Sequence, residues 1–398
     1  MAAEYQEDDG AMGFDSDSRT DLLTATPDEL GRMLQEMGYR AFRGQQLFKW
    51  LHSGVSDFHD MTTLPKDLRT ALAAEAQITA LKTVKIKESG EDGTRKYLFR
   101  LEDENTVESV LMRYRHGNSA CLSTQVGCKM GCTFCASTIG GLVRNLTAGE
   151  MIAQVLEINR DLLKTDKDFL NTDRDLQTTD RDLLKANRDV SEAGGEKPSD
   201  SVSHIVLMGM GEPLDNYRQV IRFLELVNHP DGLNVGMRRI TLSTSGLIPE
   251  IRDLASRKLQ ITLAVSLHAP NSRIRQKIMP IDRTHPMDEL LDACRFYAGH
   301  TRRRITFEYA LLKGINDQRE HAVELASKLV DVLCHVNVIP YNRVEDRPFE
   351  TVDRQQADSF ARLLSSKGVT ATVRRELGGD INAACGQLRR REESRQRK

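Results

Sequence analysis

The feature that most constrains the fold is a repeated alternation of short apolar runs with longer helical patterns. The apolar runs lie at residues 204–209, 239–243, 260–267, 305–309 and 336–339. The helical patterns lie near residues 147–160, 215–228, 247–257, 286–298, 317–330 and 354–366. Such strand–helix repetition predicts parallel βαβ units. With one more strand ending at Cys121 there are six units, so we predict an α/β fold, a partial (βα)6 TIM-like barrel whose site lies at the carboxyl ends of its strands.

A cysteine-rich loop follows the first predicted barrel strand. Cys128, Cys132 and Cys135 lie within eight residues, at spacings of four and then three. Thiolates bind soft metals, and a short loop brings three of them together at little entropic cost. A structural zinc site would normally need a second pair of ligands, but Cys294 and Cys334 are isolated in apolar surroundings. Three thiols fit better with a [4Fe–4S] cluster that leaves one iron open.

Unusual residues also stand at the ends of the predicted strands. They are Gly211 and Glu212 after the second strand, Ser243 after the third, Ser266, Leu267 and His268 after the fourth, and Asn342 after the sixth. A single Ser or Asn at such a place usually satisfies turn backbone. Together, at successive strand ends, these residues predict one ligand site at the mouth of the barrel.

The cysteine spacing C-x3-C-x2-C resembles the signature of the radical S-adenosylmethionine (SAM) enzymes. Phe134 and the pair Gly140-Gly141 match that family too. The resemblance implies that the three cysteines of the loop hold the [4Fe–4S] cluster and that SAM chelates its open iron. It also implies that the strand-end residues from Gly211 to Asn342 bind SAM.

A second resemblance is narrower and covers residues from about 27 to 390. Cys121 opens the run that ends at Cys128, and Cys385 lies in the glycine-rich segment 378–388. With Gly211-Glu-Pro and Ser266-Leu-His, this pair of extra cysteines resembles the RlmN family, which methylates carbon 2 of adenine in 23S rRNA and, next to the anticodon, in tRNA.

The resemblance implies a mechanism that uses two SAM molecules per turnover. Cys385 would take a methyl group from the first SAM. The second would give a 5′-deoxyadenosyl radical, which activates that methyl group for addition to adenine. Glu108 matches the family's proton acceptor, and Cys121 would release the covalent RNA adduct by forming a disulfide with Cys385. An electron donor such as flavodoxin or ferredoxin would be a further partner.

Two alternatives remain open at this point. A related enzyme of the Cfr type, which methylates carbon 8 of adenine, shares the cluster and both extra cysteines; the helical start and the run 380–384 favour carbon 2. From another class, a zinc-stabilised RNA-binding protein would use the thiols without catalysis. Metal analysis separates that protein from both enzymes.

The predicted barrel occupies only part of the chain. We expect an acidic, disordered leader (1–25), a helical and RNA-binding-like module (26–77), a β extension (78–116), the barrel (117–376) and a C-terminal loop with a basic tail (377–398). Inside the barrel, about residues 160–203 form an insert with a seven-residue repeat that extends a helix. Period-two alternation cannot decide whether Glu108, in the β extension, faces solvent or the interior.

The composition limits where such a chain works. The formal charge is -2, so any nucleic-acid site must be a local basic patch. The seven cysteines are unevenly placed, which excludes a secreted disulfide framework. Neither a signal peptide nor a membrane-spanning run is visible. We therefore predict a monomeric protein of the reducing cytoplasm.

Overall fold

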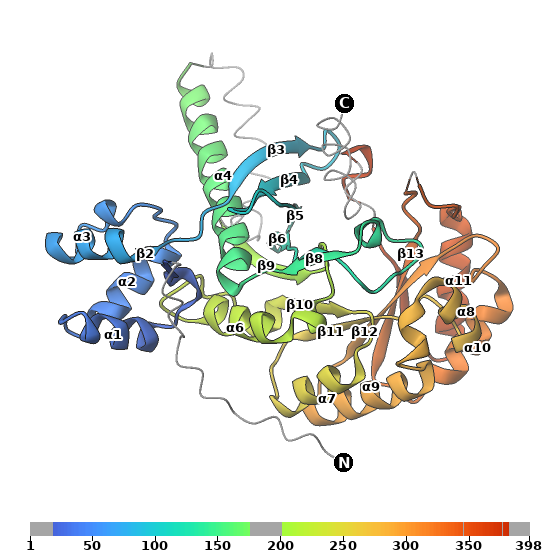
Figure 1. Cartoon of the computed structure of the whole chain (residues 1–398). Coiled ribbons are helices and arrows are strands. Elements are labelled where there is room, and N and C mark those ends of the chain that lie inside the picture. The colour runs from blue at the N-terminus through green and yellow to red at the C-terminus, as the bar shows by residue number, and fades with distance from the viewer. Residues whose placement is uncertain (1–18, 176–200, 345, 376, 382–398) are drawn as a thin grey trace. The chain divides into compact units, whose positions relative to one another are not determined.

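The computed structural model describes residues 19–175, 201–344, 346–375 and 377–381 (Figure 1). The chain divides into two compact units, Met1–Thr79 and Ala80–Lys398. Cys385 and the end of the chain lie outside the described residues.

The described part of the first unit is mainly helical. Its elements are α1 (Pro27–Glu36), α2 (Arg43–His52), α3 (Lys66–Glu75) and two short parallel strands, β1 (Thr20–Asp21) and β2 (Ala76–Gln77). Helix α1 begins with a capping box, in which Thr26 Oγ1 accepts from Glu29 N–H at 3.3 Å and Glu29 Oε2 accepts from Thr26 N–H at 2.7 Å.

The second unit is built on one ten-stranded sheet. Its order is β14-β13-β12-β11-β10-β9-β6-β5-β4-β3. The antiparallel part comprises β3 (Lys82–Glu88), β4 (Arg95–Arg100), β5 (Thr106–Tyr114) and its junction with β6 (Gly117–Cys121). From β6 onward the pairs are parallel, through β9 (Val202–Leu207), β10 (Ile240–Thr244), β11 (Thr262–Ser266), β12 (Ile305–Leu311), β13 (Cys334–Pro340) and β14 (Ala371–Val373). The predicted parallel α/β architecture is confirmed.

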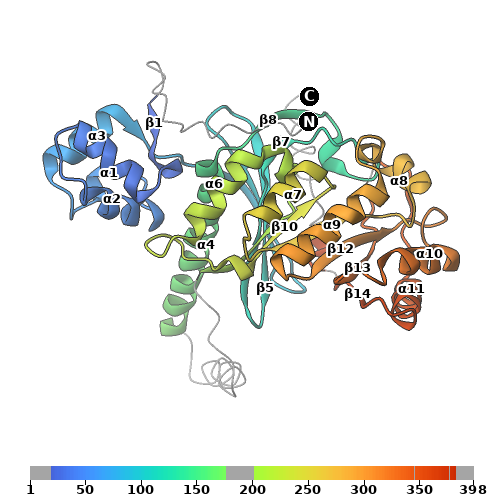
Figure 2. The same cartoon turned by 90° about the horizontal axis from the view of Figure 1, so that it is seen from below.

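Helices follow the parallel strands and cover the outer face of the sheet (Figure 2). They are α4 (Ala148–Asp175), α6 (Tyr217–Asn228), α7 (Ile248–Ser256), α8 (Ser272–Ile278), α9 (Met287–Thr301), α10 (Arg319–Leu329) and α11 (Arg354–Ser366). Helix α4 continues into the seven-residue repeat, and the rest of the insert, residues 176–200, lies outside the described residues. A small hairpin of β7 (Gln125–Gly127) and β8 (Leu142–Asn145) brackets the cysteine loop.

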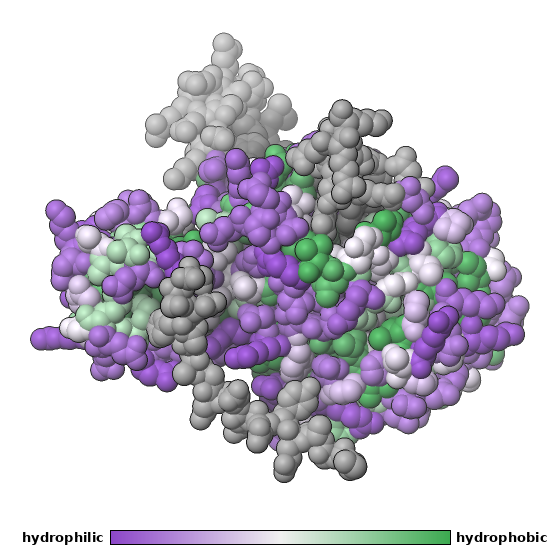
Figure 3. All heavy atoms as spheres, in the orientation of Figure 1, coloured by the Kyte–Doolittle hydropathy of each residue, from purple (hydrophilic) through white to green (hydrophobic). Residues whose placement is uncertain are grey.

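The face shown in Figure 3 is largely hydrophilic, with scattered apolar patches. Among the helices that the structure describes, none combines the length and the apolar character needed to cross a membrane.

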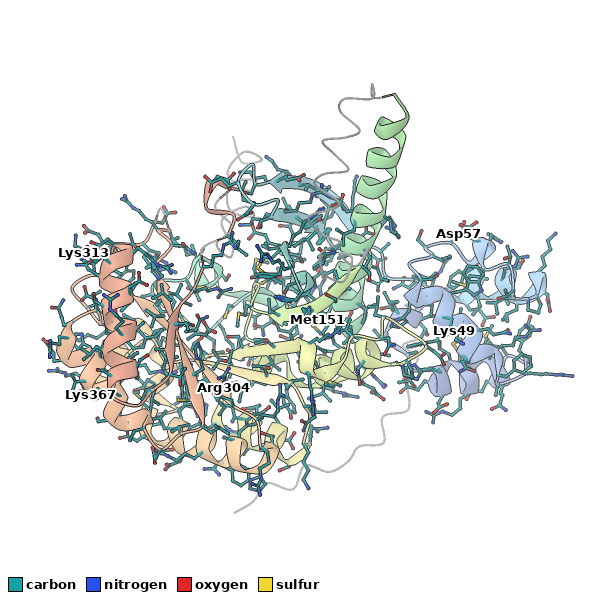
Figure 4. All side chains as sticks on the ribbon, turned by 180° about the vertical axis from the view of Figure 1, so that it is seen from behind. Lys49, Asp57, Met151, Arg304, Lys313 and Lys367 are labelled. Carbon is teal, nitrogen blue, oxygen red and sulfur yellow. The ribbon has the colours of Figure 1, made fainter. Side chains whose placement is uncertain are left out.

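The two faces of the parallel sheet differ in chemistry. On β10 and β12, residues such as Leu242 and Phe307 are fully buried and apolar, and they belong to the alternate set that meets the helices. The opposite set includes Ser243 and Glu308, so the inner face is polar. Arg304 and Lys313, labelled in Figure 4, flank β12 and mark its amino and carboxyl ends. The polar inner face is where the candidate site lies.

Candidate active site

The cysteine loop is anchored at its base by glycine geometry. Gly127, the residue before Cys128, has φ +81°, and a Cβ there would lie 2.0 Å from the carbonyl oxygen of Gly141. That same oxygen accepts a hydrogen bond from Cys128 N–H at 3.1 Å. Only glycine allows the two ends of the loop to approach this closely. The loop therefore begins and ends at a fixed point of the β7–β8 hairpin.

Within the loop, the three thiols are close enough to influence one another. Cys128 and Cys132 are buried and Cys135 is half-buried. Burial raises the pKa of Cys128 to about 12, and the nearby Cys135 thiol contributes to that rise. Burial, with Cys135 and Cys128 next, also raises the pKa of Cys132. Binding a metal to these thiols would displace their protons.

The donor set fits an iron–sulfur cluster. The three thiols of this loop would hold such a cluster through their sulfur atoms, since thiolate is the usual ligand of iron–sulfur clusters. Among the residues that the structure describes, no three His, Cys, Asp or Glu side chains are gathered closely enough for a single metal ion. A tetrahedral zinc site would need a fourth ligand beside these three thiols.

Contacts from distant parts of the chain brace the loop. Arg347 donates from one guanidinium nitrogen to Cys135 O and to Thr138 Oγ1, both at 2.8 Å. Tyr341 donates to Phe134 O at 3.1 Å, and Thr133 N–H donates to Ile278 O at 2.9 Å. We did not predict Arg347 or Tyr341, because nothing in sequence links them to a loop some 200 residues away.

Glu212 ties the ends of two neighbouring strands together. Its carboxylate accepts hydrogen bonds from Ser245 N–H at 2.7 Å and from Leu214 N–H at 3.0 Å. Burial raises the pKa of this carboxyl group, while these amides oppose the rise. The preceding Gly211 has φ +105°, and a Cβ there would lie 2.6 Å from Gln125 Cβ. Glycine is therefore required where the end of β9 passes the hairpin.

The other predicted SAM-binding residues lie at the carboxyl ends of the next strands. Ser243 and Ser266 are half-buried, Leu267 is fully buried, and Asn342 is exposed just after β13. The backbone N–H groups of Leu267 and His268 both donate to Glu308 O, at 3.1 and 3.3 Å. The structure thus brings the strand ends into one region, as the sequence predicted.

The ring of His268 has a role within the fold. Its Nδ1 accepts a hydrogen bond from Ala310 N–H at 2.8 Å, and the ring packs edge-on against Phe134 of the cysteine loop. Burial, followed by the positive charge of Arg275, lowers the pKa of His268 to about 3. The imidazole is therefore neutral at physiological pH and connects the cysteine loop to the end of β12.

A buried arginine that we did not predict holds two strand ends. Arg275 donates to Ser245 O at 2.6 Å, to Ser266 O at 3.1 Å and to Asp282 Oδ1 at 3.0 Å. Both side chains of the Arg275–Asp282 pair are fully buried. In the sequence, Arg275 and Asp282 look like ordinary surface charges, so we did not predict the buried pair.

A further pair, Glu308 and Asn337, lies side by side on the inner face. The two residues are partners in the register of β12 and β13, and Asn337 Nδ2 donates to Glu308 Oε2 at 2.9 Å. Burial raises the pKa of Glu308, and the positive charge of Arg374 opposes the rise. The signal we missed was a lone carboxylate inside an apolar strand.

Cys121 lies on the same inner face, beside two charged residues of the β extension. Burial raises the pKa of its thiol to about 11; Arg374, a hydrogen bond from Met208 N–H, and Lys96 oppose the rise, and Glu108 adds to it. Glu108 is only 3% exposed, so it faces the interior and not solvent. The structure therefore brings Cys121 and Glu108 together, while Cys385 lies outside the described residues.

Comparisons with known proteins agree with this architecture. Residues 20–78 match the model of the ribosomal RNA large subunit methyltransferase N-terminal domain, and residues 178–326 match that of the radical SAM superfamily. A probable dual-specificity RNA methyltransferase RlmN from Alkaliphilus oremlandii is 49% identical, over 94% of this chain and 98% of its own length. Another so described, from Bacillus subtilis, is 46% identical over 94% of this chain and 96% of its own.

A solved structure is similar over nearly the same extent. The radical SAM methyltransferase from Sphaerobacter thermophilus is 41% identical, with a TM-score of 0.80, and the match covers 92% of this chain and 98% of that one. With relatives this similar over nearly its whole length, the protein belongs to the RlmN family of radical SAM RNA methyltransferases.

Proposed function

We propose that this protein methylates carbon 2 of adenine in 23S rRNA and in tRNA. The observation that carries the proposal is the placement of Cys121, at the carboxyl end of β6, together with Glu108 on the inner face of the sheet. A methyltransferase whose target atom is nucleophilic would need neither a buried thiol nor a proton acceptor there. Carbon 2 of adenine is not nucleophilic, so the family's radical route to its methylation uses both a thiol and a proton acceptor.

The family's cofactors fit residues of this chain. Cys128, Cys132 and Cys135 would hold the [4Fe–4S] cluster, and SAM would lie against the strand ends. The residues proposed to contact SAM are Gly211, Glu212, Ser243, Ser266, Leu267, His268 and Asn342. When bound, the cluster and SAM supply one-electron chemistry that activates an otherwise inert methyl group, with two SAM molecules used per turnover.

The remaining steps belong to side chains of the chain itself. Cys385 carries the methyl group; once one hydrogen atom of that group has been removed, its carbon bonds to the RNA base, and the adduct then gives up one electron. Glu108 accepts the proton that leaves carbon 2: the C–H bond breaks, an O–H bond forms on the carboxylate, and the electron pair stays in the ring system. Cys121 loses its thiol proton and attacks the Cys385 sulfur; the carbon–sulfur bond breaks, the released carbon takes up a proton to become the methyl group of the product, and a disulfide remains. That disulfide must be reduced before another turnover.

The partners follow from this chemistry. The target adenine must be unstacked from folded RNA before its carbon 2 can reach the buried Glu108. A flavodoxin or ferredoxin would supply electrons, and we expect a monomer that works in the reducing cytoplasm.

One incubation tests the proposal. The reconstituted protein is mixed with reductant, SAM carrying a labelled methyl group, and either 23S rRNA fragments or tRNA. Nucleoside mass spectrometry against synthetic standards then identifies the product. We expect 2-methyladenosine from both RNAs. Labelled 8-methyladenosine, or no labelled adenine from protein that holds its iron and sulfide, would refute the proposal.

A further inference from the structure

The β extension contributes a buried ion pair to the inner face of the sheet. Lys96 on β4 lies 3.4 Å from Glu108 Oε2 on β5, and their side chains are only 1% and 4% exposed. The register places Lys96 opposite Val110, and Val110 opposite Cys121. Side chains at paired positions share one face of a sheet. Lys96, Glu108 and Cys121 therefore project together toward the inner side.

Neighbouring residues of β4 point the other way. Arg95 donates to Asp161 Oδ2 on α4 at 2.9 Å, and Tyr97 donates to the same oxygen at 2.6 Å. These contacts attach the strand to the helix layer, as expected of alternate residues. Lys96 is thus not part of the packing between β4 and α4, although Arg95 beside it is.

A stability argument alone does not explain the pair. Removing two charges from water costs more free energy than their attraction usually returns, so a well-packed apolar pair would serve the fold equally well or better. Removing only the cation, however, takes a positive charge away from a buried carboxylate. Burial without that charge favours the protonated form of a carboxyl group, which can no longer accept a proton.

We propose that Lys96 is a positioning residue for the reaction: its ammonium holds the Glu108 carboxylate ionised and oriented beside Cys121 when the proton leaves carbon 2 of adenine. This inference rests on the proposed function of the same site. Lys96 keeps its three protons throughout, and only Glu108 gains one. Among the described residues, the charged and titratable groups that face Glu108 include Lys96 from β4 and Cys121 from β6, and Arg374 acts on Cys121 from beyond β14.

The test compares Lys96→Met with two matched variants in the reconstituted full-length protein. Lys96→Arg keeps a cation at the same place. Arg95→Met removes a paired, buried cation from the adjacent position of the same strand, but on the face that meets α4. For each protein, kcat and KM for RNA are measured from pH 6 to 9 with the same reductant throughout. Iron content and thermal stability are measured alongside. Infrared difference spectra of the cluster-free chain report the protonated-carboxyl band that Glu108→Gln removes.

We expect Lys96→Met to keep its iron and its KM while the acidic limb of its kcat profile moves to higher pH by roughly 1–3 units. On that limb, kcat of Lys96→Met should be about tenfold lower than that of the parent for each pH unit by which the limb has moved. At high pH it should recover. The protonated-carboxyl band should persist to higher pH by the same interval. Lys96→Arg should restore most of the parent profile, and Arg95→Met should leave its shape unchanged.

The outcomes separate the two proposals. If the parent protein makes no 2-methyladenosine, the proposed function fails. If the parent makes it and Lys96→Met shows the parent's pH profile and infrared band, the role of Lys96 is refuted. A uniform loss of kcat at every pH, shared with Arg95→Met, would also refute it, because it would indicate only a weakened strand.

Discussion

Replacing Gly127 with alanine should disable the cysteine loop. The residue has φ +81°, and its added Cβ would lie 2.0 Å from Gly141 O. A left-handed conformation costs a non-glycine residue about 1–2 kcal/mol. Relieving so short a contact costs about a further 1–3 kcal/mol, as overpacking does. Moving Gly141 O also breaks the hydrogen bond from Cys128 N–H, worth about 1 kcal/mol. The total is about 3–6 kcal/mol, enough to open the base of the loop.

The loop contains a matched control. Gly141 has φ +72°, but a Cβ there would meet no atom within 4 Å. Gly141→Ala should therefore lower the free energy of unfolding only by the cost of the left-handed backbone conformation, about 1–2 kcal/mol. Urea unfolding of the metal-free proteins gives the free energies, and iron content after reconstitution reports whether the three thiols still converge.

We expect Gly127→Ala to bind little iron and Gly141→Ala to bind most of the parent's amount. Equal losses of stability and iron in the two variants would refute the reasoning, since the contact with Gly141 O would then contribute nothing. A Gly127→Ala protein with full iron content would show that the hairpin can shift without cost to the loop.

Three further predictions use the same site. Cys132→Ala should lose cluster iron and reductive SAM cleavage, measured as iron content and 5′-deoxyadenosine, because two thiols remain where three are needed; a normal amount of either would contradict it. Cys121→Ala should accumulate bound covalently to RNA, whereas Cys385→Ala should show neither protein methylation nor an RNA adduct. Ribonuclease digestion followed by peptide mass spectrometry measures both. Cys121→Ala protein that is free of RNA and still makes methylated product would overturn the assignment. Folding lowers the pKa of His268 to about 3, so the folded state favours the neutral ring. The resulting stabilisation is complete at pH values above the pKa of histidine in the unfolded chain, and it is lost as the pH falls toward 3. Between about pH 6.5 and 3 its share of the unfolding free energy should fall by about 1.4 kcal/mol per pH unit, and His268→Asn should remove that share of the slope in urea titrations.

Periodicity predicted the parallel sheet well because its apolar runs are long and regularly spaced. Each predicted barrel strand after residue 200 lies within two residues of an observed one, from β9 to β13. The missed elements are short: α8 has seven residues and β14 has three. Segments of that length contain too few residues to establish a period, and tertiary contacts decide their conformation.

The site was predictable where spacing along the chain carries the signal. The cysteine loop and the polar strand ends are local patterns; the structure places the first between β7 and β8 and the second at the ends of the parallel strands, and their binding roles stay predictions. Arg347 and Arg275 could not be found in this way. Each is a single arginine whose partners, Cys135 O and Ser266 O among them, are backbone atoms that only the folded chain brings near.

Glu108 shows a different limit. Alternation along β5 identifies which residues share a face, but not which face is buried. The order of the sheet decides this: β5 joins β6, so the face that carries Cys121 also carries Glu108. A shift of the β5–β6 pairing by one residue would turn Glu108 toward α4 and bring Ser109, which now donates to Gln154 at 2.8 Å, to the inner side. The antiparallel extension is therefore part of the proposed site, because its register brings a carboxylate and its cation to the thiol that the parallel sheet supplies.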